Sequence, residues 1–277
     1  MYPLSLYPLP AKHKGGCMKQ YTELKNKRVL VTGGTQGIGE AMANAFAAQE
    51  CKLAINGRVL NEKVQKVVDR TGAFPVMGSL DDTNIATKIV NDTVSKFGGI
   101  DVLVANAAGM DMKPFLEHEE KAWWHQVNIN LTGHLACIQA AIPHMIKQKS
   151  GSIVIISSFF GTLGWNNASG YGASKSGLLT LGQYLAREYR KYNINVGIII
   201  PGVIRTAQLQ VDADDLGMSY DAVCDMYAEG IPMHRIGLPE EIASMAVFMS
   251  TQAGGRGLSG RHIQISGGDY RTTPYYV

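Results

Sequence analysis

The chain has 277 residues, of which 45% are hydrophobic and 18% charged, and its formal net charge is +3. This composition is typical of a globular protein and excludes a largely disordered one, and a chain of this length folds without a disulfide or metal staple. The charge is too small for a nucleic-acid-binding surface, so we expect no nucleic-acid partner.

Cysteine and histidine residues show no metal-site pattern. None of the four cysteines forms a C-x-x-C motif, and the seven histidines have no ligand spacing beside them. Scattered thiols indicate a reducing compartment, so we expect a cytoplasmic protein without a metal. The sequence has no run of about 18 apolar residues, so we expect no membrane partner.

Short apolar runs rich in valine and isoleucine alternate with longer stretches of helical period. The predicted strands are 28–32, 52–56, 73–77, 101–106, 152–157, 195–200 and 262–265, and the predicted helices are 38–49, 61–71, 84–97, 117–147, 172–191 and 240–250. Because the strands are apolar on both faces and alternate with helices, the pattern predicts an α/β fold with a doubly wound parallel sheet of about seven strands.

One such sheet uses the available length, so we expect a single domain over 26–277, preceded by an N-terminal extension, 1–25, that is disordered. The segment 206–235 is longer than an ordinary connection and follows the carboxyl end of a strand. Since ligands bind at that edge of such sheets, the segment is predicted to be a substrate lid. The alternative is a pair of short helices packed on the edge of the core.

The first predicted strand passes through a glycine-rich loop directly into a helix. Glycines permit a tight turn and close approach of the backbone to a phosphate, while the helix N-terminus offers free N–H groups to a pyrophosphate. A plain turn is the alternative, but the position between strand and helix favours nucleotide binding. The candidate residues are Gly33, Thr35, Gln36, Gly37, Ile38 and Gly39.

A tyrosine and a lysine four residues apart share one face of a predicted helix. They are Tyr171 and Lys175, and Ser158 lies thirteen residues before the tyrosine, at the end of the fifth strand. In a doubly wound sheet these groups face the nucleotide crevice. The same spacing in Tyr21 and Lys25 is interpreted as accidental, because it lies in the N-terminal arm.

With these motifs the chain resembles the classical short-chain dehydrogenase/reductase family over about residues 27–268. The resemblance implies a Rossmann-type sheet of seven strands and an oxidoreductase that transfers a hydride between a nicotinamide cofactor and a carbonyl or secondary alcohol. Further matching motifs are Asn106-Ala107-Ala108-Gly109, Asn130, the Pro201-Gly202 turn with Thr206, and Gly267-Gly268.

The resemblance also implies catalytic roles. Tyr171 would be the general acid or base, Ser158 would donate to the substrate oxygen, and Asn130 would hold a water that passes protons to Lys175. The alternatives are that Asn130 only marks a helix kink and that Ser157 points into the site instead. An ammonium about 5 Å from the phenol, at an effective dielectric of ~20, contributes about 3.3 kcal/mol, so we expect Lys175 alone to bring the pKa of Tyr171 into working range.

Cofactor contacts follow from the same resemblance. Where the family has an acid near the adenine, the chain has Ser79, a weaker acceptor. The Ile204 backbone is expected at the carboxamide. Besides the glycine loop, the implied contacts are Arg58, Ser79, Leu80, Asn106, Ala107, Ala108, Tyr171, Lys175, Pro201, Gly202, Ile204 and Thr206.

The end of the second strand predicts the choice of cofactor. By the family alignment, Gly57 takes the position of an acid that accepts hydrogen bonds from the adenosine ribose, and Arg58 follows it. A guanidinium pairs with a 2′-phosphate through two hydrogen bonds, so we expect NADP(H) to be preferred over NAD(H). Two observations weigh against this: Gln36 replaces a second cation, and Arg58 could be a solvated loop residue.

Two other functions are considered. One is a 3-oxoacyl-carrier-protein or thioester reductase. The other is a nucleotide-sensing regulator without catalysis, which the presence of Tyr171 and Lys175 disfavours. The predicted pocket is apolar and partly aromatic, which favours a hydrophobic or cyclic small-molecule carbonyl or alcohol substrate. The apolar helices 117–147 and 172–191 predict a homotetramer or homodimer.

Overall fold

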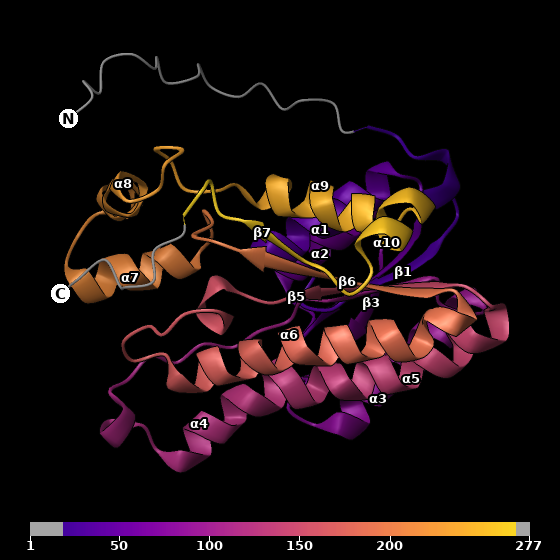
Figure 1. The fold of residues 1–277 in the computed structure, drawn as a ribbon, viewed down its shortest axis with the longest axis horizontal. Helices are drawn as coiled ribbons and strands as arrows, with labels where there is room; N and C mark the ends of the chain where they lie inside the picture. The colour runs from indigo at the N-terminus through magenta and orange to yellow at the C-terminus, as the bar shows by residue number, and fades with distance from the viewer. Residues whose placement is uncertain (1–18, 270–277) are drawn as a thin grey trace.

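The strands of the computed structural model, which describes residues 19–269, form one parallel sheet in the order β3-β2-β1-β4-β5-β6-β7 (Figure 1). The predicted α/β fold and its doubly wound sheet are confirmed, and each strand ends within one residue of its prediction. The strands are β1 (Arg28–Val31), β2 (Lys52–Gly57), β3 (Phe74–Met77), β4 (Val102–Ala105), β5 (Gly151–Ile156), β6 (Ile194–Pro201) and β7 (His262–Ile265).

Helices cover both faces of the sheet. Figure 1 shows α3 to α6 on one face and α1, α2, α9 and α10 on the other. Within residues 19–269, none of the helices combines the length and hydrophobicity needed to cross a bilayer. The helices are α1 (Gly37–Ala48), α2 (Glu62–Thr71), α3 (Thr83–Phe97), α4 (Glu120–Val127), α5 (Gly133–Gln148), α6 (Ser169–Tyr189), α7 (Gln208–Leu216), α8 (Tyr220–Glu229), α9 (Pro239–Met249) and α10 (Gln252–Leu258).

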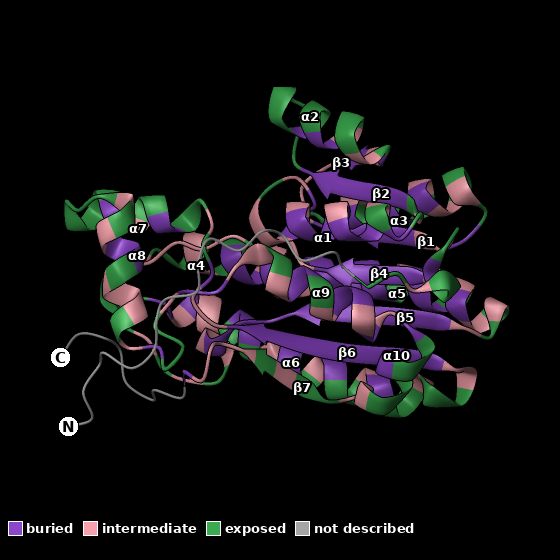
Figure 2. Ribbon diagram, turned by 90° about the horizontal axis from the view of Figure 1, so that it is seen from above, coloured by how far each residue is buried: buried purple, intermediate pink, exposed green. Residues whose placement is uncertain are grey.

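Each face of the sheet has its own apolar core. Ile138 of α5 and Leu178 of α6 are fully buried on one face, and Phe46 of α1 and Ile242 of α9 are fully buried on the other. Every residue of β4, β5 and β6 is buried. Figure 2 shows the same division, with buried strands between helices whose outer faces are exposed. Coverage on both faces explains why these strands are continuous apolar runs.

Two predicted elements differ in detail. The predicted helix 117–147 is interrupted by a π-helical turn, Asn128–Thr132, between α4 and α5. The segment 206–235 contains two short helices, α7 and α8, which close over a small core of their own. That core consists of Leu209, Cys224, Ile231 and Ile236. The alternative of two short helices is therefore correct, and movement of the segment as a lid stays a prediction.

The expectation that residues 1–25 form a disordered extension is wrong for residues 19–25. Leu24 is only 1% exposed and belongs to the core around α1 and α9. The Gln49 side chain donates to the Lys19 carbonyl at 3.1 Å and accepts from the Tyr21 amide at 2.7 Å. These contacts attach residues 19–25 to the folded chain. The expectation for residues 1–18 lies outside the described residues.

Candidate active site

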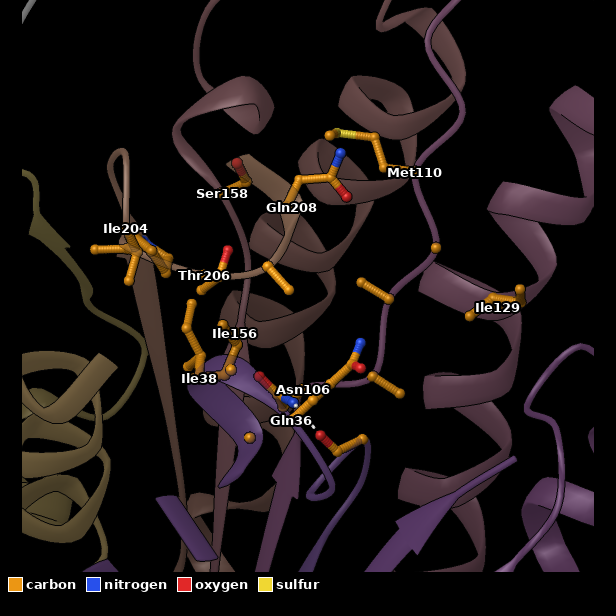
Figure 3. A pocket seen from close by; sticks show the side chains of 18 of the residues that line it. Gln36, Ile38, Asn106, Met110, Ile129, Ile156, Ser158, Ile204, Thr206 and Gln208 are labelled. Atoms are coloured by element: carbon orange, nitrogen blue, oxygen red, sulfur yellow. Dashed lines mark hydrogen bonds between the residues drawn. The ribbon is translucent and has the colours of Figure 1, made fainter. Parts of the chain in front are cut away.

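A cavity of about 620 Å³ lies at the carboxyl ends of the strands, and it brings the predicted site residues together. Every predicted cofactor contact lines it, as do Ser158, Tyr171 and Lys175. Asn130 lies behind the wall and contacts it through Gly109. Figure 3 shows how Gln36 and Ile38 from the glycine loop, Asn106 from the β4 turn, and Ile204 and Thr206 from the segment after β6 converge on this space.

The glycine loop forms a backbone cradle. A Cβ atom at Gly39 would lie 1.9 Å from the Gly33 carbonyl oxygen, and Gly37 has a φ of 53°. Both positions therefore require glycine. In the described chain, no side chain caps α1 at Gln36, so the first N–H groups of the helix are available to an anion. These features fit the pyrophosphate of a dinucleotide.

The turns after β1 and β4 are joined by side chains. The Asn106 side-chain amide donates to the Thr32 carbonyl at 2.9 Å, and the Asn106 backbone amide donates to the Thr32 hydroxyl at 2.9 Å. The Ala107 amide donates to the same hydroxyl at 3.2 Å. The sheet reverses its order between β1 and β4, where doubly wound sheets bind their ligands. These hydrogen bonds therefore fix both walls of the crevice between the two turns.

The tyrosine, serine and lysine meet on the floor of the cavity. Ser158, at the end of β5, hydrogen-bonds the Tyr171 phenol and accepts from the Phe160 amide at 3.2 Å. Lys175 follows Tyr171 by one helical turn on α6; its ammonium lies 5.6 Å from the phenol ring centroid and donates to the Ile156 carbonyl at 2.9 Å. These positions agree with the helical spacing that the sequence indicates.

Ser157 also lines the cavity, but its hydroxyl is engaged elsewhere. Its hydroxyl donates to the Lys175 backbone carbonyl at 2.9 Å and is thereby tied to α6. Because successive side chains alternate at the end of a strand, Ser158 is the one that faces Tyr171. The alternative assignment to Ser157 does not fit this geometry.

The pKa values of Lys175 and Tyr171 differ from the expectation. Lys175 is 1% exposed, and burial lowers its pKa to about 7. Burial also raises the pKa of the Tyr171 phenol, which the hydrogen bond from Ser158 only partly offsets. The expectation that Lys175 alone lowers the pKa of Tyr171 is therefore wrong for this structure. The reason is that desolvation disfavours the charged form of both groups, including the ammonium that was to supply the charge.

Asn130 occupies the π-helical turn and pins the loop after β4. Its side chain accepts from the Gly109 amide at 2.8 Å and donates to the Gly109 carbonyl at 2.9 Å and to the Ser174 hydroxyl at 3.1 Å. The helix is locally distorted at this residue, as the alternative of a kink residue expects, and its role in holding a water stays a prediction. No direct contact joins it to Lys175 among the hydrogen bonds of the described residues.

His134 is a site residue that sequence reasoning missed. It is fully buried; its Nδ1 lies 2.8 Å from the Asn130 carbonyl oxygen and its Nε2 3.5 Å from the Thr32 hydroxyl. Burial, and secondarily the charge of Lys175, lower its pKa to about 3, so the ring is neutral near pH 7. The only sequence signal was its place four residues after Asn130, one helical turn along.

The adenosine end of the cavity is built around the tip of β2. Gly57 lies so close to Thr35 that a Cβ atom there would come 2.7 Å from the Thr35 Cγ2. Arg58 is exposed and lines the cavity. Asn56 is 2% exposed and donates to the Val76 and Gly78 carbonyls at 3.0 Å. The tip is thus rigid and carries a cation without an adjoining acid at position 57.

Burial of Lys175 gives a test of stability against pH. Between pH 7 and 10.5 the unfolded chain binds a proton that the folded amine, with a pKa of about 7, releases, so the stability of the native protein rises with pH over this window. Lys175→Met removes that penalty. We expect it to raise the free energy of unfolding at pH 7 by about 1–3 kcal/mol, allowing for the lost hydrogen bond.

The advantage of the methionine variant should shrink as the pH approaches 10, measured by urea unfolding. Lys66→Met, on the exposed side of α2, is the matched control and should show no such trend. A difference between Lys175→Met and the native protein that is constant from pH 7 to 10 would contradict desolvation of the amine as its cause.

Comparisons with known proteins identify the family. The family model for short chain dehydrogenases matches residues 27–216. A 3-oxoacyl-(acyl-carrier-protein) reductase of Staphylococcus epidermidis is 31% identical over 88% of this chain and 99% of its own. An L-rhamnose-1-dehydrogenase of Scheffersomyces stipitis is 33% identical over 88% of this chain and 96% of its own.

Solved structures give the same result. Levodione reductase superposes with a TM-score of 0.82 at 27% identity, over 88% of this chain and 97% of the other. A short chain dehydrogenase from Bacillus anthracis superposes with a TM-score of 0.79 at 27% identity, over 90% and 98%. The chain therefore belongs to the short-chain dehydrogenase/reductase family and is an NAD(P)H-dependent oxidoreductase that acts on carbonyl or CH–OH groups.

Proposed function

We propose that the protein reduces a small-molecule ketone with NADPH, or oxidises the corresponding alcohol with NADP⁺, and that Tyr171, Ser158, Lys175 and Asn130 carry the proton chemistry. The observation that supports this most directly is the hydrogen bond between Ser158 and the Tyr171 phenol inside the cavity that the glycine loop also lines. It places the two hydroxyl groups side by side, so that a substrate oxygen entering the cavity could bind between them.

Each residue has a distinct task in the proposed mechanism. The bound cofactor supplies or accepts the hydride. Ser158 holds the substrate oxygen, and Tyr171 gives that oxygen its proton during reduction. The Lys175 amine, whose pKa is about 7, is able to exchange a proton near neutrality, so it is suited to restore the proton of Tyr171. To Asn130 we assign the water through which this proton would arrive.

The cofactor would lie along the carboxyl edge of the sheet. Its pyrophosphate would bind the glycine loop at Gly33, Thr35, Gln36, Gly37, Ile38 and Gly39, and its adenosine end would lie near Arg58, Ser79 and Leu80. Its nicotinamide end would meet the remaining contacts, which are Asn106, Ala107, Ala108, Tyr171, Lys175, Pro201, Gly202, Ile204 and Thr206.

Tyr171→Phe should lower kcat by at least about 100-fold, because it removes the proton donor and keeps the ring. Tyr21→Phe is the matched control. Tyr21 packs against Phe248, with ring centroids 6.4 Å apart, and does not line the cavity, so its variant should keep native turnover. Steady-state NADPH oxidation with a ketone panel measures both, and equal behaviour of the two variants would refute the assigned roles.

Arg58→Ala should lower the preference for NADPH over NADH by about 10- to 150-fold, because a charge-assisted pair with the 2′-phosphate is worth ~1.5–3 kcal/mol. The measurement is the ratio of kcat/KM values for the two cofactors. Arg261→Ala, an exposed arginine before β7 at the opposite edge of the sheet, should leave the ratio unchanged. A native preference for NADH would contradict the proposed pairing.

We also propose that the protein is a homotetramer. Part of the apolar surface of α6 is used inside the chain, because Leu178 and Leu179 are buried. The support now comes from Trp124 of α4 and Tyr184 of α6, which are 51% and 71% exposed. Light scattering at micromolar concentration should give about four times the mass of one chain, and Tyr184→Glu should lower it. A native mass equal to one chain would exclude assembly.

Reduction of a 3-oxoacyl thioester is the second candidate, because the relatives from Staphylococcus carry that name at about 30% identity. Turnover of acetoacetyl thioester, compared with that of a small cyclic ketone, distinguishes the two.

A further inference from the structure

One wall of the cavity carries polar side chains that the proposed chemistry does not use. Gln208 and Asp212 are four residues apart on α7, and Tyr227 is on α8; all three line the cavity. The Tyr227 hydroxyl lies 3.2 Å from the Asp212 Oδ2, and Gln208 also hydrogen-bonds this carboxylate. In Figure 3, Gln208 projects into the same space as Met110 and Ser158.

The carboxylate of Asp212 loses part of its hydration in this position, which costs free energy. Asp212 is half-buried, and burial raises its pKa, which two hydrogen bonds only partly offset. A clamp between α7 and α8 could be built from apolar contacts, as their shared core already is. The desolvation of such a polar wall is offset when a ligand supplies further hydrogen bonds to it.

The neighbouring wall carries a pair of stacked aromatic rings. The rings of Phe160 and Trp165 stack with centroids 5.0 Å apart and planes 19° apart. Phe160 also meets the Tyr171 ring edge-on, with centroids 5.9 Å apart. The aromatic surface therefore adjoins the proton donor, and it suits the face of a non-planar ring whose C–H groups pack on aromatic carbon.

The two walls together specify one kind of substrate. An amide, a carboxylate and a phenol offer both donors and acceptors, and a hydroxyl group uses both through a single oxygen. An ammonium would use only the acceptors, and an acyl chain would use neither and leave Asp212 desolvated without compensation.

We propose that the substrate is a polyhydroxylated ring, a sugar or cyclitol, whose hydroxyl groups bind Asp212, Gln208 and Tyr227 while its face packs on Phe160 and Trp165. The proposal rests on the proposed function, because the pair Tyr171 and Ser158 defines which substrate oxygen reacts.

The test compares matched alcohols in the oxidative direction. Cyclohexanol, 1,4-cyclohexanediol, myo-inositol and a panel of aldohexoses are offered with NADP⁺, and kcat/KM is measured for each. The native enzyme should favour at least one hydroxylated ring over cyclohexanol by about 10-fold or more. Asp212→Asn should lower this preference by about 10- to 100-fold, because it replaces a charged acceptor with a neutral amide.

Asp214→Asn is the matched control. Asp214 is an exposed acid on the same helix whose carboxylate accepts from Gln210 at 2.8 Å, and its variant should keep the native preference. The proposal is overturned if Asp212→Asn leaves the preference unchanged, which would make Asp212 a helix clamp. It is equally overturned if the native enzyme favours cyclohexanol, oxidises none of these alcohols, or turns over acetoacetyl thioester better than any ring.

Tyr171→Phe, assayed in parallel, separates this inference from the function on which it rests. If Tyr171→Phe abolishes turnover while Asp212→Asn keeps the native preference, only the substrate class is wrong. If Tyr171→Phe retains turnover, the proposed function itself fails.

Discussion

The hydrogen bonds between Thr32 and Asn106 hold together the two turns at which the sheet reverses its strand order. The crevice exists because the connections after β1 and β4 diverge there, and it stays in shape because those turns cannot separate. His134 extends the same network, since its ring lies between the Thr32 hydroxyl and the Asn130 carbonyl. The glycine loop and the helices that carry the candidate site residues are thus linked by one buried hydrogen-bonded frame.

Burial determines the pKa values of the ionisable groups in this frame. Lys175 and His134 are both almost inaccessible to water, and both have lowered pKa values. A neutral imidazole beside the lysine avoids a second buried positive charge. The frame therefore holds the groups to which we assign proton transfer, and burial keeps the lysine close to the midpoint of its titration at neutral pH.

The fold was largely predictable because parallel strands covered on both faces are short apolar runs, as in β5 and β6. The failures have specific causes. Helix α10, Gln252–Leu258, contains three glycines and no apolar period, and it is helical because it packs on α9 and β6 and is capped by Thr251. The order of residues 19–25 could not be predicted, because the residue that attaches them to the core, Leu24, is a single apolar residue outside any helical or strand period.

The candidate site also contains residues that could be predicted from the sequence and residues that could not. Residues within local motifs, such as Tyr171 and Lys175, were found from spacing, because one helix fixes their geometry. Asp212, Tyr227 and His134 were not found, since only tertiary packing brings them to the cavity or to its frame. The direction of the Tyr171 pKa was also wrong, because a pairwise Coulomb energy omits the desolvation of both partners.

The contact between Gly57 and Thr35 constrains how this enzyme could evolve. An acid at position 57 would favour NADH, yet its Cβ would lie 2.7 Å from the Thr35 methyl, so the Thr35 side chain would have to shift. The two positions are therefore coupled, and their substitutions would not add. Under the proposed preference for NADPH, a lineage that exchanges its cofactor would have to accommodate the loop threonine together with the glycine, which would make that preference hard to lose one substitution at a time.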